Sequence, residues 1–385
     1  MADFDWTGAT SSAWTTGSNW SVSGTPQASP PTNADNAIFS GGSSAACTTG
    51  AGATCLNMTC TGYTGTLTVS GGTFAVLGNI TGASGMTLAG SSAVTCSGGI
   101  TTVSGMTWTH TGLWTFNATS GTHDINFTGV TLDNALTFNG VGGSWRLMAN
   151  LTSTGAAKAL TLTNGNLDFN DFNVTVGLFN SNNGNTRTWS LGNGTLTAIS
   201  TSTSTPLNIA TTTGLTLNAE GSTIVFSANI GLARTLNIAG TAGDGLTLNN
   251  FTFSGTSTGD LNIVSASGKT ITFNTITIND APQEIVTTAG ITVEAAQWNI
   301  SGTSGNANVF TSATPGSTYT FNKVGGGIVE VDYVSLTDCI CLPANNWYIG
   351  AGGTVGSGTT GAIATAEPDT PLRLGGRKRH LIRSV

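Results

Sequence analysis

The stretch that decides the fold runs from Leu236 to Asp280 and reads LNIAGTAGDGLTLNNFTFSGTSTGD, then LNIVSASGKTITFNTITIND. The unit LNI recurs at 236 and 261, LTL at 246 is answered by ITF at 271, and FTF at 251 by ITI at 276. Each pair is offset by 25 residues. Because every unit is apolar-x-apolar, its two apolar side chains share one face of a strand.

The repeat predicts an all-β fold, a right-handed parallel β-helix (solenoid) with about 25 residues per coil, stacked through parallel main-chain hydrogen bonds. Asn249 and Asn274 occupy equivalent turns, so we expect their amides to stack as a ladder. The composition agrees, since Thr, Val, Ile and Phe favour strands whereas Gly and Asn favour turns. We expect these apolar positions to share one core: Leu236, Ile238, Leu246, Leu248, Phe251, Phe253, Leu261, Ile263, Ile271, Phe273, Ile276 and Ile278.

Similar units occur upstream and downstream, from LTV at 67 to VSL at 334, and they set the expected domain boundaries. Residues 1–38, rich in Trp and Pro, would form an N-terminal cap or attachment segment, residues 39–350 the β-helix, and residues 351–385 a Gly-rich linker and basic C-terminal tail. A terminal coil exposes strand edges that favour aggregation. We therefore expect Trp6, Trp14 and Trp20 to fold over the first coil.

Charge separates the end of the chain from the rest. The chain holds 11 basic and 18 acidic residues, and five of the basic ones, with no acidic one, lie in residues 373–385. Residues 1–372 therefore carry a formal charge of −12. Apolar Leu372 and Leu374 are interleaved with this charge. The pattern favours docking on a partner protein over nucleic acid or a solvated tail, and the partner-binding residues would be Arg373, Arg377, Lys378, Arg379, Leu381, Ile382 and Arg383.

No cofactor or metal site is expected from the sequence. The six cysteines lack zinc-site spacing and are interpreted as buried free thiols, with disulfides as the alternative: Cys47, Cys55, Cys60, Cys96, Cys339 and Cys341. No apolar run approaches the ~18–20 residues that span a bilayer. The start, MADFDWTGATSSAW, shows no secretory signal peptide.

Catalytic candidates are weak, and no catalytic residue is assigned. Asp168 with Asp171, and Glu330 with Asp332, are carboxylate pairs of the kind that glycosidic cleavage requires, but solvated surface charge explains them more simply. His110 and His123 are interpreted as surface histidines of the coils. The GTSTG at 255–259 matches a nucleophile pattern without its strand-turn-helix context, and GAGGTV at 350–355 only approaches a dinucleotide fingerprint.

Three segments carry a resemblance: DWTGATSSAWTTGSNWSVSGTP from Asp5, NVTVGLFNSNNGNTRTWSLGNGTL from Asn173, and SGTSGNANVFTSATPGSTYTFNKVGGGIVEVDYVSLTD from Ser301. They resemble Gly/Thr-rich β-helix proteins of bacteriophage virions, of the head-fibre, decoration or tail-fibre type. The opening is also similar to the start of some bacterial autotransporter passengers.

The resemblance implies a non-enzymatic structural protein at the virion surface, anchored to a neighbouring capsid or tail protein by the C-terminal segment. A tailspike-type polysaccharide depolymerase is the alternative, and a bacterial surface adhesin is a further one. A host surface glycan and a second copy of the chain stay open as partners, whereas a membrane is not expected and nucleic acid is disfavoured.

Overall fold

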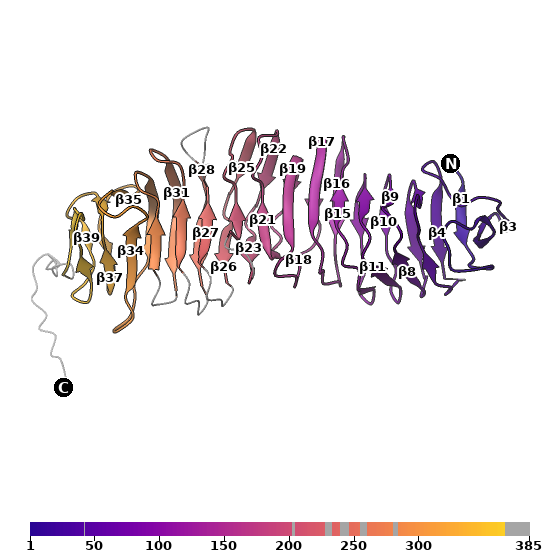
Figure 1. Cartoon of the computed structure of the whole chain (residues 1–385), viewed down its shortest axis with the longest axis horizontal. Helices are drawn as coiled ribbons and strands as arrows, with labels where there is room; N and C mark the ends of the chain where they lie inside the picture. The colour runs from indigo at the N-terminus through magenta and orange to yellow at the C-terminus, as the bar shows by residue number, and fades with distance from the viewer. Residues whose placement is uncertain are drawn as a thin grey trace, which may run out of the picture.

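The computed structural model describes residues 1–41, 43–201, 205–227, 233–238, 246–254, 260–279 and 284–365. Its chain winds into an elongated parallel β-solenoid of about 13 turns, which confirms the predicted fold class. Figure 1 shows the coils stacked along one axis, with the N-terminus at one end of the rod. Apart from a single 3-10 turn at Gly17–Asn19, the described residues form no helix.

Three rows of strands make up the three faces of the rod. The first face, which we call face P, is a continuous parallel ladder. Its strands are β6 (Thr54–Cys55), β9 (Phe74–Val76), β12 (Val94–Cys96), β15 (Trp114–Phe116), the first part of β17 (Leu136–Leu147), the first part of β19 (Ala159–Asp168), β21 (Leu178–Asn180), β24 (Leu207–Asn208), β27 (Arg234–Asn237), β30 (Leu261–Val264), β32 (Glu284–Thr287), β34 (Asn308–Ser312), β37 (Val334–Leu336) and β40 (Thr354–Val355).

Face Q is the second row, and two ladders build it. The first ladder holds β1 (Asp3–Trp6), β4 (Asn36–Ser40), β7 (Met58–Thr61), β10 (Ile80–Thr81), β13 (Ile100–Thr101), β16 (Thr122–Asn126), the second parts of β17 and β19, β22 (Arg187–Ser190) and β25 (Leu215–Asn218). The second ladder holds β28 (Leu246–Thr247), the first parts of β31 (Thr270–Ile278) and β33 (Thr292–Asn299), β35 (Tyr319–Lys323) and β38 (Cys339–Leu342).

Face R is the third row. It holds β5 (Cys47–Thr48), β8 (Thr66–Val69), β11 (Thr87–Gly90), β14 (Thr107–Trp108), β18 (Leu151–Thr152), β20 (Val174–Val176), β23 (Thr195–Ala198), β26 (Thr223–Phe226), β29 (Asn250–Phe253), the second parts of β31 and β33, β36 (Val329–Glu330), β39 (Trp347–Tyr348) and β41 (Ala362–Ile363).

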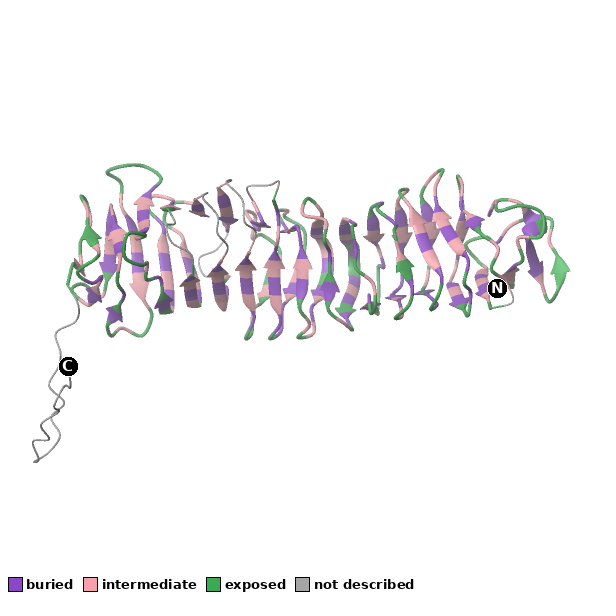
Figure 2. Ribbon diagram, turned by 90° about the horizontal axis from the view of Figure 1, so that it is seen from below, coloured by how far each residue is buried: buried purple, intermediate pink, exposed green. Residues whose placement is uncertain are grey.

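The core follows from alternation within these strands. In a typical unit such as Val94-Thr95-Cys96 the outer two side chains are buried and the middle one faces outward, and Figure 2 shows the same banding along the rod. Eleven of the twelve predicted core positions are buried. Leu246 is the exception: it is half-buried and packs against the core. Each fully buried Leu, Ile or Phe contributes about 1.5–3 kcal/mol.

The coil length varies along the rod around the predicted value of about 25 residues. Phe74 pairs with Val94, 20 residues on, whereas Ile224 pairs with Phe251, 27 residues on. Leu236 pairs with Ile263 and not with Leu261, although both leucines lie on neighbouring strands of one sheet. Residues are added mostly at the turns, so coil length varies around an average spacing of about 22. The 25-residue offset holds between Leu246 and Ile271 and between Phe251 and Ile276.

The solenoid extends past both boundaries expected for it. Strand β1 already pairs in parallel with β4, so residues before 39 belong to the ladder. Beyond 350, β40 pairs with β37 and β41 with β39, so residues 351–365 complete a further coil and are not a linker. Apolar side chains are sparse in this coil, which is why the sequence pattern did not reveal it.

Tryptophans fill the N-terminal end of the core. Trp6, Trp14 and Trp20 are buried, with ring centroids 5.0 Å apart for Trp6–Trp20 and 4.7 Å for Trp14–Trp20. The outer edge of β1 is paired antiparallel with β2 (Trp20–Val22), which in turn pairs with β3 (Thr25–Pro26). The edge strand is therefore two residues long and carries a proline, which disfavours edge-to-edge aggregation.

The six cysteines are free and buried, as predicted. Burial raises the pKa of Cys60 and Cys96 to about 12. These thiols therefore stay protonated near neutral pH and behave as small apolar side chains.

Candidate functional site

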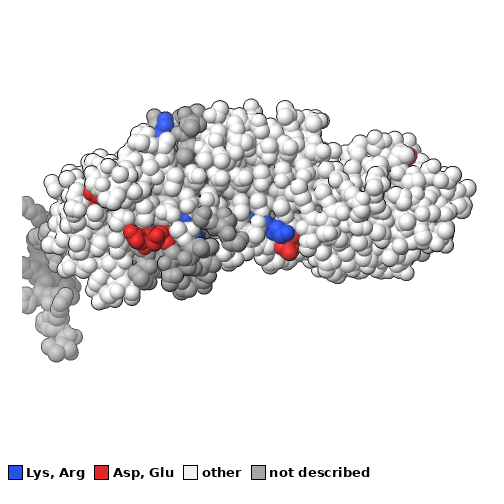
Figure 3. All heavy atoms as spheres, in the orientation of Figure 1, with Lys and Arg blue, Asp and Glu red and all other residues white. Residues whose placement is uncertain are grey.

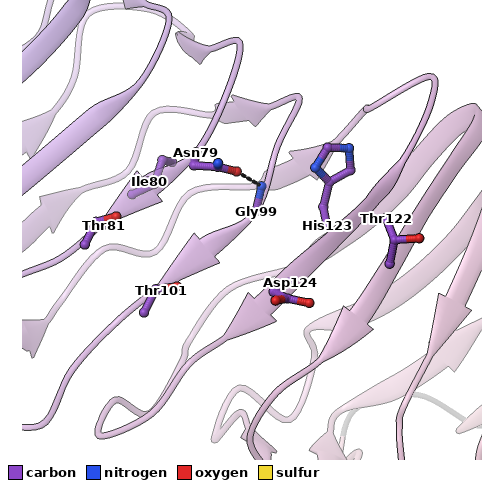
Figure 4. Close-up of a pocket in the computed structure, with 8 residues that line it drawn as sticks. All are labelled: Asn79, Ile80, Thr81, Gly99, Thr101, Thr122, His123 and Asp124. Atoms are coloured by element: carbon purple, nitrogen blue, oxygen red, sulfur yellow. Dashed lines mark hydrogen bonds between the residues drawn. The ribbon is translucent and has the colours of Figure 1, made fainter.

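A polar hollow of about 310 Å³ lies on face Q where short strands give way to longer ones. Strands β10 and β13 have two residues each, whereas the neighbouring β16 has five. Ile100 pairs with Ile125, so Thr122, His123 and Asp124 project past the start of β13. The step between the strands leaves the hollow that Figure 4 shows.

Gly99 forms part of the floor, because a Cβ there would lie 2.3 Å from the carbonyl oxygen of Asp124. A ladder of asparagine side-chain amides ends at the hollow. Asn57 Nδ2 donates to Asn36 Oδ1 at 2.9 Å, the backbone N–H of Asn79 donates to Asn57 Oδ1 at 2.8 Å, and that of Gly99 donates to Asn79 Oδ1 at 2.8 Å. One rim of the hollow is therefore held by side-chain amides from successive coils, and Figure 4 shows the last bond, between Gly99 and Asn79.

An exposed ion pair borders the hollow. Arg146 Nη2 lies 2.9 Å from Asp124 Oδ1, and in the strand register Arg146 stands between Asp124 and Asp168. Exposed pairs of this kind contribute only about 0–1 kcal/mol to stability. The pair fixes the position of the Asp124 carboxylate more than it stabilises the fold.

His123 and Asp124 do not form an acid–base pair. Adjacent residues of a strand point to opposite faces, and Figure 4 shows the imidazole directed away from the carboxylate. The ring Nε2 of His123 is instead 2.9 Å from the carbonyl oxygen of Ser120. With Thr81 and Thr101 in its lining, the hollow offers hydroxyl, amide and carboxylate groups. That set can hydrogen-bond an uncharged polyhydroxylated ligand, but it does not form a nucleophile–base constellation.

The first predicted carboxylate pair is engaged in turns. Asp168 Oδ1 accepts from the backbone N–H of Asn170 at 2.8 Å, and Asp171 Oδ1 accepts from the backbone and side-chain nitrogens of Asn193 at 2.7 and 3.0 Å. Asp171 sits at φ +64°. Both carboxylates therefore stabilise the turn after β19 and its contact with the next coil.

The second pair, Glu330 and Asp332, is exposed on the same side of its segment, as predicted. It borders a hollow of about 320 Å³ with Ser301 and Gly350. Asp332 Oδ1 accepts from the backbone N–H of Tyr333 at 2.8 Å and of Gly352 at 3.3 Å. The GAGGTV segment thus forms a turn, whose Gly352 N–H bonds Asp332, and then strand β40. It does not form the strand-to-helix loop of a dinucleotide site.

His110 is not a surface residue, which corrects the interpretation from the sequence. It is fully buried; its Nδ1 accepts from Trp114 Nε1 at 3.1 Å and from Asn134 Nδ2 at 3.0 Å, while Nε2 lies 2.9 Å from the carbonyl oxygen of Ser92. These contacts fit the neutral imidazole. Burial lowers the pKa of His110, and the contact with Ser92 partly offsets this.

Two buried arginines were missed. Arg187 and Arg234 are each 1% exposed and begin strands β22 and β27. Arg187 makes five hydrogen bonds to the Ser181 hydroxyl and to backbone carbonyls of Ser181, Asn185, Thr211 and Thr213. In the local sequences RTW and RTL, arginine takes the place of the first apolar residue of an apolar-x-apolar unit. This substitution is the sequence feature that could have predicted the buried arginines.

Several predicted features lie outside the described residues: the GTSTG segment at 255–259 and the partner-binding set from Arg373 to Arg383. Within the described part of the chain, no cluster of His, Cys, Asp and Glu is suited to hold a metal ion. The described segments also include no helix long and apolar enough to cross a membrane.

Comparison with known proteins found no matching family model, no matching curated protein and no matching solved structure.

Proposed function

We propose that the chain is a non-enzymatic structural protein on the exterior of a phage particle, a head fibre, decoration protein or tail fibre. The observation that supports this most directly is the unbroken ladder of face P, from β6 to β40. About 13 turns at a strand spacing of ~4.8 Å give a rod about 60 Å long. A rod of this kind is suited to projecting from a surface.

The surface chemistry is consistent with a passive rod. Figure 3 shows Lys, Arg, Asp and Glu in only a few places on the visible face. Asp168, Asp171 and Asp332, three of the four carboxylates considered for catalysis, accept hydrogen bonds that fix turns. These contacts give those carboxylates a structural role.

In this proposal the C-terminal tail, residues 366–385, attaches the rod to a neighbouring virion protein. Its five positive charges would steer it to an acidic surface, and Leu372, Leu374, Leu381 and Ile382 would then bury apolar area there. Chain termini that follow Pro-containing segments can reach other chains.

The test is to delete residues 372–385 and measure the amount of the protein in purified particles by mass spectrometry. We expect the solenoid to stay folded by circular dichroism, while occupancy on particles is lost. Attachment of the full-length chain should also weaken as salt rises, because the Debye length shortens. Full occupancy by the truncated chain would instead place the anchor elsewhere, with residues 1–38 as the next candidate.

The polar hollow beside Asp124 gives a second candidate role, contact with a host surface glycan. Thr81 and Thr101 would donate and accept hydrogen bonds there. A glycan array probed with the full-length chain tests this: Thr101→Val should reduce binding, and the matched change Thr216→Val on β25 should not. Turnover of a polysaccharide that Asp168→Asn or Glu330→Gln abolishes would favour the depolymerase alternative.

A further inference from the structure

The ladder of face Q is interrupted between two successive coils. Strands β24, β25 and β26 form one coil, and β27, β28 and β29 form the next. On face P, β24 pairs with β27, and on face R, β26 pairs with β29. No pairing between described residues joins β25 to β28, and β28 pairs only with β31. Among the described residues, β25 is thus paired only with β22.

Burial changes at the same place. Leu217 pairs with the fully buried Trp189, and Leu246 pairs with the fully buried Ile271. Both leucines, together with Leu215, are only partly buried. The interruption therefore leaves apolar side chains in contact with solvent, where neighbouring coils bury theirs.

A groove of about 380 Å³ opens at this interruption and continues along the corner of the rod. We call it the corner groove and define it by six of its residues: Leu217, Glu220, Leu248, Phe273, Asn274 and Val324. Val324 is 38% exposed, and Glu220 is exposed at the rim. The groove thus combines an apolar floor with a negative charge at its rim.

The C-terminal tail carries the complementary chemistry. Leu372-Arg373-Leu374 is an apolar-x-apolar unit like Leu215-Thr216-Leu217 and Leu246-Thr247-Leu248, the strands on either side of the interruption. In an extended segment the two leucines would share one face, and the long arginine stem could place its charge at the rim. Extended peptides commonly bind with pockets that receive alternate side chains.

We propose that the corner groove binds the segment Leu372–Leu374 of a second copy of this chain. This proposal rests on the proposed structural function, and it identifies one neighbour of the tail. Leu372 and Leu374 fill the groove beside Leu217, and Arg373 pairs with Glu220. The net charge of −12 on residues 1–372 against five positive charges in the tail favours this contact at long range.

Reach favours a second copy over the chain's own tail. Along face Q, β28, β31, β33, β35 and β38 follow β25, and Thr360 bridges to β38. These six spacings of ~4.8 Å amount to about 29 Å. The seven residues from 365 to Leu372 extend at most about 25 Å. The chain's own Leu372 therefore falls short of β25.

The experiment is sedimentation velocity of the full-length chain over a range of protein and salt concentrations. We expect concentration-dependent association that weakens as salt rises. The double substitution Leu372→Asp with Leu374→Asp should weaken association by at least about tenfold. The matched control Leu113→Asp, at a leucine 43% exposed on another coil, should leave association unchanged.

A charge reversal makes the test specific. Glu220→Lys and Arg373→Glu should each weaken association, and the two together in one chain should restore it, because the pair is then reversed. A chain that stays monomeric throughout, or a double reversal that does not restore association, would overturn the proposal. Particle occupancy of the unsubstituted chain separates the two proposals. A chain that never self-associates but occupies particles refutes the groove alone, whereas a chain that self-associates but does not occupy particles refutes the virion role alone.

Discussion

The N-terminal coils and the coils between 205 and 279 are built from the same apolar-x-apolar unit, yet they differ in length. Phe74, Val94 and Trp114 follow one another at 20-residue intervals, whereas Ile224 and Phe251 are separated by 27. The short coils pair on all three faces, whereas in the longer ones no pairing between described residues joins β25 to β28 on face Q. Faces P and R therefore keep the pairing between these two coils when the turns gain residues. On face Q the described residues show no such pairing.

The two regions also differ in the side chains that fill their interiors. The N-terminal end is filled by Trp6, Trp14 and Trp20 against Phe39, whereas the middle of the rod buries Arg187 and Arg234. Aromatic packing suits a core with regular rungs, because rings fill the space between strands without requiring partners. A buried guanidinium needs acceptors, and at Arg187 backbone carbonyls of neighbouring turns supply them.

The largest effect is expected at the N-terminal end. Trp20→Ala should lower the free energy of unfolding by about 3–5 kcal/mol, because it opens a cavity between Trp6, Trp14 and Phe39 and removes the hydrogen bond from Trp20 Nε1 to the carbonyl of Trp14. Urea unfolding measures the loss. Trp20→Phe, which keeps a ring, should cost less; an equal cost for both changes would contradict the cavity argument.

The next effect separates the two buried arginines. Arg187→Met should destabilise the fold by about 2–4 kcal/mol, since it leaves buried carbonyls of Ser181 and Thr211 without donors. Arg234 has no hydrogen-bond acceptor among the described residues and lies over the ring of Phe253 at 5.3 Å. Replacing an unpaired buried charge by an apolar side chain is often neutral or stabilising, so Arg234→Met should cost less in the same urea assay. A reversed order would show that Arg234 has acceptors.

His110 makes the N-terminal half sensitive to pH. Burial depresses its pKa in the folded chain, so the unfolded state binds the proton more readily, and stability falls as pH drops below the unfolded value of ~6.5. His110→Gln should cost about 1–3 kcal/mol at pH 7.5 through lost hydrogen bonds. It should also flatten the fall in unfolding free energy between pH 7.5 and 5. An unchanged pH profile in the variant would assign the fall to other groups.

The fold was predictable because apolar-x-apolar spacing is a local signal, and strands such as Phe251–Phe253 and Ile276–Ile278 stack in the predicted register. The coil lengths were not predictable, since turns lie outside the ladder and place no constraint on the pattern. The hollow beside Asp124 was also hidden, because it depends on β16 being longer than β13.

The smallest effect tests the amide ladders of the two regions. Asn249 and Asn274 do lie at stacked turns, since the backbone N–H of Asn274 donates to the carbonyl oxygen of Asn249 at 2.7 Å. The predicted ladder of their side-chain amides is wrong: Asn274 Nδ2 donates to Asn250 Oδ1 at 3.2 Å, while Asn249 Nδ2 donates to the carbonyl of Ser222. In the short coils, Asn57 bonds both Asn36 and Asn79, so one side chain links three coils.

Asn57→Ala should therefore cost about 0.5–1.5 kcal/mol, and Asn274→Ala no more than about 0.5 kcal/mol. Hydrogen exchange of the Asn79 amide measures the difference locally, because its acceptor is Asn57 Oδ1. Faster exchange in Asn57→Ala, together with a larger loss of unfolding free energy than in Asn274→Ala, would show that the amide ladder reinforces the regular coils more than the irregular ones. Equal costs for the two changes would mean that side-chain ladders contribute alike wherever coils stack, and that the difference between the two regions lies in the backbone pairing alone.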